Sequence, residues 1–170
     1  MLSPKTGLDE LKRKYRVLER NVLLLIVIPL PFFSYAYLYT TGKSRSLSIP
    51  DLPELLNYLL LILVFGGLLI QQIRFNRELK STHRNSLTFE ERFLIYVRIT
   101  VDRYWILLVV GILCSAGLIL FENPGFTIAY ASCLIVVSLG KPTPDRIVSG
   151  LRLKNEEKDK VYEISRREDL

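Results

Sequence analysis

Apolar residues in this chain fall into four long blocks, and charged residues fill the segments between them. The blocks cover residues 22–39, 52–73, 104–121 and 125–140. A helix needs about 20 apolar residues to cross the hydrocarbon core of a bilayer. The first three blocks are long enough, whereas the fourth would extend only roughly 24 Å at 1.5 Å per residue. The fourth block can therefore span only with little tilt or in a locally thin bilayer.

This pattern predicts an all-α, polytopic membrane protein in which the whole chain, residues 1–170, forms one membrane domain with four transmembrane helices. A protein with three spans and a re-entrant fourth segment is the alternative. The first block, which follows a basic stretch, also resembles a cleavable signal peptide, but the polar stretch before it is long and favours a retained span. Pro29 and Pro31 lie inside this block and predict a bend in its helix.

Positive charge alternates between the segments that connect the blocks. Lys and Arg are frequent in the N-terminal segment, in the segment between blocks two and three, and in the C-terminal tail, for example at Lys12, Arg13, Lys14, Arg16 and Arg20, at Arg74, Arg77, Lys80, Arg84 and Arg92, and at Lys141 and Arg146. The loop after block one holds only Lys43 and Arg45, and the turn after block three holds Glu122 and no cation. The positive-inside rule then places both termini in the cytoplasm. It also puts Tyr104 and Trp105 at the inner membrane interface.

Three segments outside the blocks are predicted to be helical. In residues 1–21, Leu8, Leu11, Tyr15 and Leu18 recur at helical spacing between cations, which predicts an amphipathic helix on the inner membrane surface. Residues 88–103 should extend the third transmembrane helix into the cytoplasm, starting at a Thr88–Glu91 capping box. The tail, residues 143–170, should form cytoplasmic helices, the first opened by Pro144.

Composition narrows the function only by exclusion. The net charge of +6 is explained by basic cytoplasmic segments that meet anionic lipid, so we expect no nucleic-acid partner. Cys114 and Cys133 form no zinc motif, and the only histidine, His83, cannot ligate a metal or haem alone. No ionisable residue lies in the middle of a block, which disfavours proton pumps, ion-coupled carriers and voltage sensors. We find no catalytic, cofactor or metal motif.

Two groups of residues are candidates for contacts. Five charged residues near the inner membrane edge are candidates for binding lipid or a protein partner, namely Arg98, Asp102, Arg103, Lys141 and Arg146. Arg98 and Asp102 have the spacing of a salt bridge on one helix face. Small residues at four-residue spacing, Gly111 with Ser115 and Gly125 with Ala129, predict close helix packing within the chain at blocks three and four, with self-association as the alternative.

The second half of the chain resembles a family of small, uncharacterised bacterial four-helix integral membrane proteins. The resemblance covers about residues 88–155 and rests on Tyr96-Val97-Arg98, on Lys141-Pro142-Thr143-Pro144-Asp145-Arg146 and on Leu151-Arg152-Leu153. The family often has an acidic residue where Gly150 stands here, so a role for a carboxylate at that position does not carry over. The resemblance implies a multi-pass topology in a bacterial cytoplasmic (inner) membrane and implies no activity.

Three functions fit these observations. The first is a non-enzymatic scaffold or accessory subunit of a membrane assembly, with protein partners. The second is a homo-oligomeric channel or transporter, for which Ser34, Asn57 and the Pro29–Pro31 bend are the candidate pore features. The third is a membrane-bound enzyme that acts on lipid through Arg98, Asp102 and Arg103.

Overall fold

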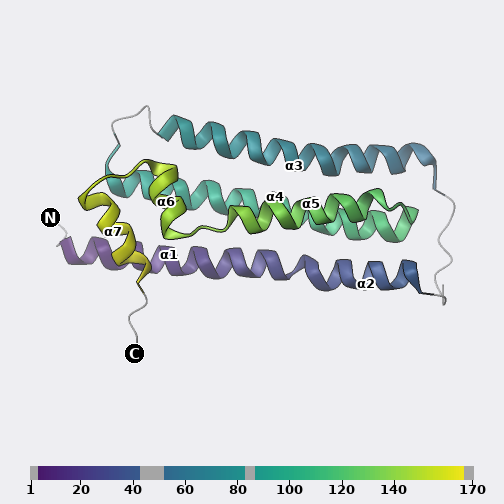
Figure 1. The fold of residues 1–170 in the computed structure, drawn as a ribbon, viewed down its shortest axis with the longest axis horizontal. Coiled ribbons are helices and arrows are strands. Elements are labelled where there is room, and N and C mark those ends of the chain that lie inside the picture. The colour runs from purple at the N-terminus through teal and green to yellow at the C-terminus, as the bar shows by residue number, and fades with distance from the viewer. Residues whose placement is uncertain (1–3, 43–51, 83–86, 167–170) are drawn as a thin grey trace. The chain divides into compact units, whose positions relative to one another are not determined.

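The structure is a computed structural model that describes residues 4–42, 52–82 and 87–166, with the backbone alone described for residues 4–8. Within these ranges it has helices and no strands, as predicted (Figure 1). The helices are α1 (Pro4–Val27), α2 (Pro29–Thr41), α3 (Glu54–Thr82), α4 (Phe89–Phe121), α5 (Gly125–Gly140), α6 (Pro144–Leu151) and α7 (Glu156–Ser165). The predictions for Lys43, Arg45, His83 and Arg84, and for the side chain of Leu8, lie outside the described residues.

Three helical stretches are long and apolar enough to cross a membrane. They are Asp9–Thr41, Glu54–Thr82 and Phe89–Phe121. Helix α5, with 16 residues, becomes a fourth candidate only when it is taken together with α6, as a span broken between Gly140 and Pro144. The chain therefore has three to four candidate membrane spans, and a full crossing by residues 125–140 stays a prediction.

Prolines set two of the helix boundaries. Helix α1 ends at Val27, and Pro29 opens α2 at the start of the helix, where a residue without an N–H is tolerated best. Pro29 thus divides the first apolar block between two helices, which together form the single candidate span Asp9–Thr41, and the bend that we expected there stays a prediction. Pro144 opens α6 in the same way, after Thr143 in an extended conformation.

The chain divides into two compact units. Unit 1 contains residues 1–23, 74–102 and 141–170, and unit 2 contains residues 24–73 and 103–140. Unit 1 holds 20 of the 23 Lys and Arg residues and 14 of the 17 Asp and Glu residues, a difference of +6, whereas unit 2 holds three of each kind. Charge is therefore concentrated almost completely in unit 1.

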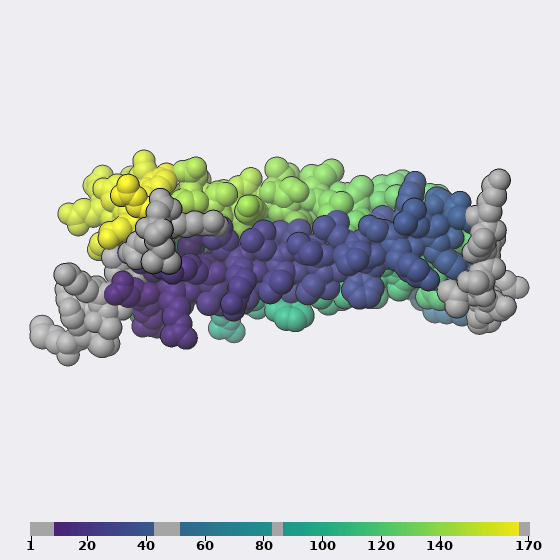
Figure 2. Space-filling view, turned by 90° about the horizontal axis from the view of Figure 1, so that it is seen from below, coloured from purple at the N-terminus to yellow at the C-terminus, as the bar shows by residue number. Residues whose placement is uncertain are grey.

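Unit 1 has its own apolar core, built from three segments that are far apart in the sequence. The start of α1 lies beside the α6–α7 segment (purple and yellow in Figure 2). Nine buried side chains from α1, α4, α6, α7 and the short connection between α6 and α7 form the core: Leu11, Tyr15, Phe93, Tyr96, Ile147, Leu151, Leu153, Val161 and Ile164. The hydroxyl of Tyr15 also donates to the Pro142 carbonyl at 3.5 Å.

This core corrects one detail of the sequence analysis. Leu11, Tyr15 and Leu18, which we predicted to face the membrane surface, are buried. The amphipathic pattern of residues 1–21 therefore reflects a helix face covered by protein. Contact of its polar side with the inner membrane surface stays a prediction.

Unit 2 consists of the end of α1, α2, most of α3, and the hairpin that the second part of α4 forms with α5. Phe33 of α2 stacks on Tyr130 of α5 with ring centroids 3.7 Å apart. The hairpin turns at Asn123, whose side-chain Oδ1 accepts a hydrogen bond from the Gly125 N–H at 2.8 Å. Large apolar side chains on α3 stay exposed, including Ile62 and Leu69, as expected for a surface in contact with lipid.

Candidate functional site: the charged unit and its borders

Four of the five predicted contact residues lie on unit 1 and are exposed. Arg98 and Asp102 are on α4, Lys141 precedes α6, and Arg146 is in the first turn of α6. The structure does not form the predicted salt bridge, because no ion pair joins Arg98 to Asp102 in the part of the chain that it describes. Both side chains are therefore available at the surface of unit 1.

Arg103 differs from these four. It belongs to unit 2, is 8% exposed, and donates from Nη2 to the Gln72 Oε1 of α3 at 3.0 Å. A Cβ atom at Gly140 would lie 3.1 Å from the Arg103 Cζ, so the guanidinium fills the space that the glycine leaves. Arg103 thus joins α3 and the end of α5 within unit 2, a role that its place in a basic segment did not suggest.

The predicted packing residues all lie in unit 2. Gly111 is buried where a Cβ would meet Pro29 of α2 at 2.9 Å, and the Ser115 hydroxyl donates to the Gly111 carbonyl at 3.0 Å. Ala129 is fully buried, and a Cβ at Gly125 would meet Leu61 of α3 at 3.2 Å. The closest approach is at Gly117, where a Cβ would lie 2.4 Å from the Phe126 ring of α5. The spacing of small residues in the sequence did not predict this contact.

Polar side chains in unit 2 join its helices. The Tyr104 hydroxyl donates to the Val137 carbonyl of α5 at 3.0 Å, and the ring is buried. Tyr104 is therefore not the interfacial ring that we predicted, whereas Trp105 is exposed. Asn57, a candidate pore residue, accepts a hydrogen bond from the Asn123 amide at 3.2 Å and so holds α3 to the hairpin turn.

A hollow of about 450 Å³ lies between α1 and α4 within unit 1. On α1 it is lined by Arg13, Lys14, Val17 and Asn21, and on α4 by Val97 and Val101. Lys14 forms an ion pair with Glu10, also at the hollow, with 3.0 Å between the charged atoms. Two cations thus stand beside an apolar floor.

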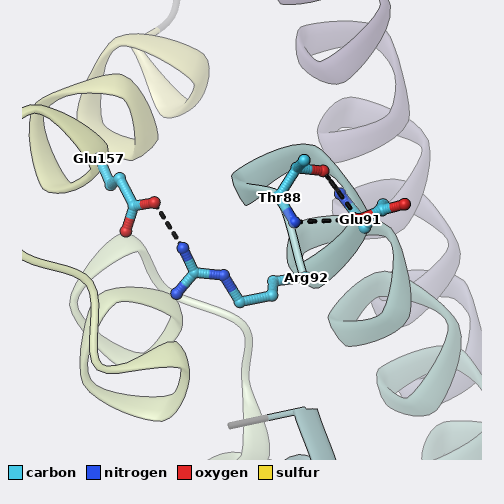
Figure 3. Close-up of polar contacts among 4 residues, drawn as sticks. All are labelled: Thr88, Glu91, Arg92 and Glu157. Carbon is cyan, nitrogen blue, oxygen red and sulfur yellow. Dashed lines mark hydrogen bonds and ion pairs between the residues drawn. The ribbon is translucent and has the colours of Figure 1, made fainter. Parts of the chain in front are cut away.

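Polar contacts fix α4 and α7 within unit 1 (Figure 3). The Thr88 N–H donates to Glu91 Oε2 at 2.9 Å, and the Glu91 N–H donates to Thr88 Oγ1 at 3.4 Å, which confirms the predicted capping box. The bonds from Thr88 hold the pKa of the Glu91 carboxyl below its ordinary value. Arg92 on the next position forms an ion pair with Glu157 of α7.

The Arg92–Glu157 pair should stabilise the docking of α7. Both side chains are partly buried, and the Arg92 Nε lies buried without an acceptor in the described part of the chain. Glu157→Gln should therefore lower the free energy of local opening of α7 by about 1–2 kcal/mol, because it leaves a half-buried cation without its partner charge. Amide hydrogen exchange of α7 in the full-length protein measures this change.

Glu156→Gln is the matched control for that prediction. Glu156 is exposed and lies in the same first turn of α7, so both variants lose the same favourable charge at the helix N-terminus. Equal acceleration of α7 exchange in the two variants would contradict a specific role for the Arg92 pair.

The chemistry that these residues offer is binding by charge and apolar surface. Among the described residues, no group of three or more His, Cys, Asp or Glu side chains is placed to hold a metal ion. A scan against protein-family models finds no match for this chain, and searches of the curated proteins and of the solved structures find none either.

Proposed function

We propose that this protein is a non-enzymatic scaffold or accessory subunit of a membrane assembly, and that unit 1 is its cytoplasmic docking module. One observation carries the proposal. Unit 2 covers residues 24–73 and 103–140. These borders fall within two residues of positions 22, 73, 104 and 140, where the predicted spans meet the cytoplasmic side of the membrane. Compactness in space and hydropathy in the sequence therefore divide the chain at nearly the same positions.

The charge distribution supports an inward-facing unit 1. Its excess of Lys and Arg belongs in the cytoplasm by the positive-inside rule, together with both chain ends. The same excess favours an anionic inner leaflet, and the family resemblance favours a bacterial cytoplasmic membrane. In this arrangement α6, α7 and the first part of α1 stand at the inner membrane face.

A docking role is favoured because unit 1 is more than a set of loops. Its nine core residues come from segments as distant as Leu11 and Ile164, so the chain uses its charged ends to build one folded body. Its exposed cations include Lys141 and Arg146. Arg146 lies on α6, where its guanidinium presents directional contacts to an acidic partner surface, and Lys141, just before α6, adds a second positive charge.

Gentle extraction of the full-length protein from its native membrane, followed by mass measurement of the complex, tests this proposal. We expect a heteromeric complex that the double variant Lys141→Gln/Arg146→Gln weakens and that Arg16→Gln/Arg20→Gln leaves intact. The second pair lowers the net charge equally, and both of its residues are exposed on α1.

Two results would contradict it. A pure homo-oligomer that conducts ions in liposomes would favour the channel function instead. A monomer that carries no partner when it is isolated in native lipid, without detergent, would show that unit 1 has no assembly to which it docks.

A further inference from the structure

The hollow between α1 and α4 is lined by both apolar and positively charged side chains. Val17, Val97 and Val101 form an apolar floor, and Arg13 and Lys14 stand beside it. Its volume of about 450 Å³ is within the usual range for small-molecule sites, roughly 300–1,000 Å³. A ligand that matches it must be both apolar and anionic.

Arg13 and Lys14 differ in their interactions with other side chains. Lys14 is paired with Glu10 one helical turn away, and the pair is largely exposed, so the exchange of Glu10 for another anion costs little. The Arg13 side chain is exposed and donates to no acceptor within the described residues. An anionic ligand can therefore bind the Arg13 guanidinium directly, and it competes with the Glu10 carboxylate for the Lys14 ammonium.

The position of the hollow along α1 indicates that such a ligand comes from the membrane. Asn21, at one end of the lining, immediately precedes the first predicted span, which starts at Val22. Lys14 is seven residues from Asn21, a rise of about 10 Å along the helix. The headgroup layer beside the hydrocarbon core is roughly 5–8 Å thick on each side, and a lysine or arginine side chain reaches back across the remaining distance.

We propose that this hollow is a binding site for one anionic phospholipid of the inner leaflet. The lipid phosphate contacts Arg13 and Lys14, its glycerol ester region contacts Val17 about one turn nearer the membrane, and its upper acyl carbons reach Val101 and the membrane end of the hollow at Asn21. The site is separate from the partner surface proposed at Lys141 and Arg146. It requires only that α1 enters the membrane near Val22, so it can fail while the docking role holds.

Native mass spectrometry of the full-length protein, titrated in detergent with dioleoylphosphatidylglycerol, tests the site. Arg13→Gln/Lys14→Gln should weaken lipid retention by about tenfold or more, since each surface cation contributes several-fold to anionic lipid binding. Glu10→Gln should strengthen retention, because it removes the anion that competes for Lys14. Dioleoylphosphatidylcholine should be retained weakly by all variants.

Arg16→Gln/Arg20→Gln is the matched control. It removes the same charge from the same helix at positions outside the lining, so it separates a defined site from general attraction to a cationic protein. Equal losses in the two double variants, or no gain from Glu10→Gln, would overturn the proposal.

A second variant tests the apolar half of the site. Val101→Trp keeps every charge and fills the floor, so we expect it to lower phosphatidylglycerol retention while circular dichroism shows the same helix content. Unchanged retention would overturn the proposal. Equal binding of glycerol 1-phosphate, which has the headgroup charge and no acyl chains, would show a soluble phosphate ester as the ligand and would also overturn it.

Discussion

Gly117→Ala should destabilise the α4–α5 hairpin by about 1–3 kcal/mol, the usual cost of overpacking a close-packed interior. A Cβ atom at position 117 would lie 2.4 Å from Cε1 and 2.6 Å from Cζ of Phe126. Phe126 is fully buried, and its ring stacks on Phe121 with centroids 6.3 Å apart. The added Cβ would therefore force the buried ring or the helix backbone to shift.

Gly66→Ala is the control within unit 2. Gly66 also lies in a predicted transmembrane helix, and a Cβ there meets nothing within 4 Å. Alanine favours helix more than glycine does, so this variant should be neutral or slightly more stable. Reversible unfolding in mixed micelles of mild detergent and dodecyl sulfate, followed by circular dichroism, compares the two.

Phe126→Leu provides the rescue for Gly117→Ala. Leucine lacks the two ring atoms nearest to the added Cβ, so the double variant should be more stable than the sum of the two single effects predicts. Equal stability of the Gly117 and Gly66 variants, or strict additivity with Phe126→Leu, would show that the helices do not approach as closely as the structure indicates.

Phe93→Ala should have the largest effect on unit 1, with a loss of about 3–5 kcal/mol in its stability. Phe93 is fully buried and belongs to the core that α1, α4, α6 and α7 share. Its loss leaves a large cavity where apolar side chains from all four helices meet. Amide hydrogen exchange should become faster in α6 and α7, while α5 in unit 2 keeps its protection.

Leu94→Ala is the matched control, since Leu94 is the next residue on α4 and is 36% exposed. It should change exchange little in either unit. If Phe93→Ala instead accelerates α5 as much as α7, the chain opens as one cooperative domain, as the single-domain prediction had it. If neither unit responds, the core of unit 1 is not organised as described.

The features that the sequence predicted well are local ones. The capping box at Thr88 and Glu91 needs residues only three positions apart, and the interruptions at Pro29 and Pro144 follow from the missing N–H of a single residue. The candidate spans follow from continuous apolar length. Each of these signals acts within one helix, so no knowledge of the tertiary contacts is needed.

The features that the sequence did not predict depend on which helix face is covered. Asp102 and Arg103 are neighbours in the sequence, yet the first is exposed and the second is buried, because successive helical residues point about 100° apart. The spacing of Leu11, Tyr15 and Leu18 shows that the helix has an apolar face. It does not show whether protein side chains or lipid cover that face. The Arg92–Glu157 pair joins residues 65 positions apart, for which the sequence has no local signal.

Topology is the part of the proposed function on which the remaining parts depend. If unit 1 lies in the cytoplasm, residues 16 and 152 share one side of the membrane, and the α4–α5 turn at Glu122 lies on the other side. All three residues are exposed in the structure. Cys114 and Cys133 are the free cysteines of the described chain, and both are buried, so their replacement by alanine gives a background for single cysteines.

Labelling of Arg16→Cys, Glu122→Cys and Arg152→Cys in intact cells with a membrane-impermeant maleimide is the most direct measurement. We expect the cysteine at position 122 to be labelled from outside, and those at positions 16 and 152 to be labelled only after the membrane is permeabilised. Labelling of position 152 in intact cells would show that residues 125–140 do not cross the membrane as proposed. It would also separate the two ends of unit 1 across the bilayer, which contradicts a single cytoplasmic docking module.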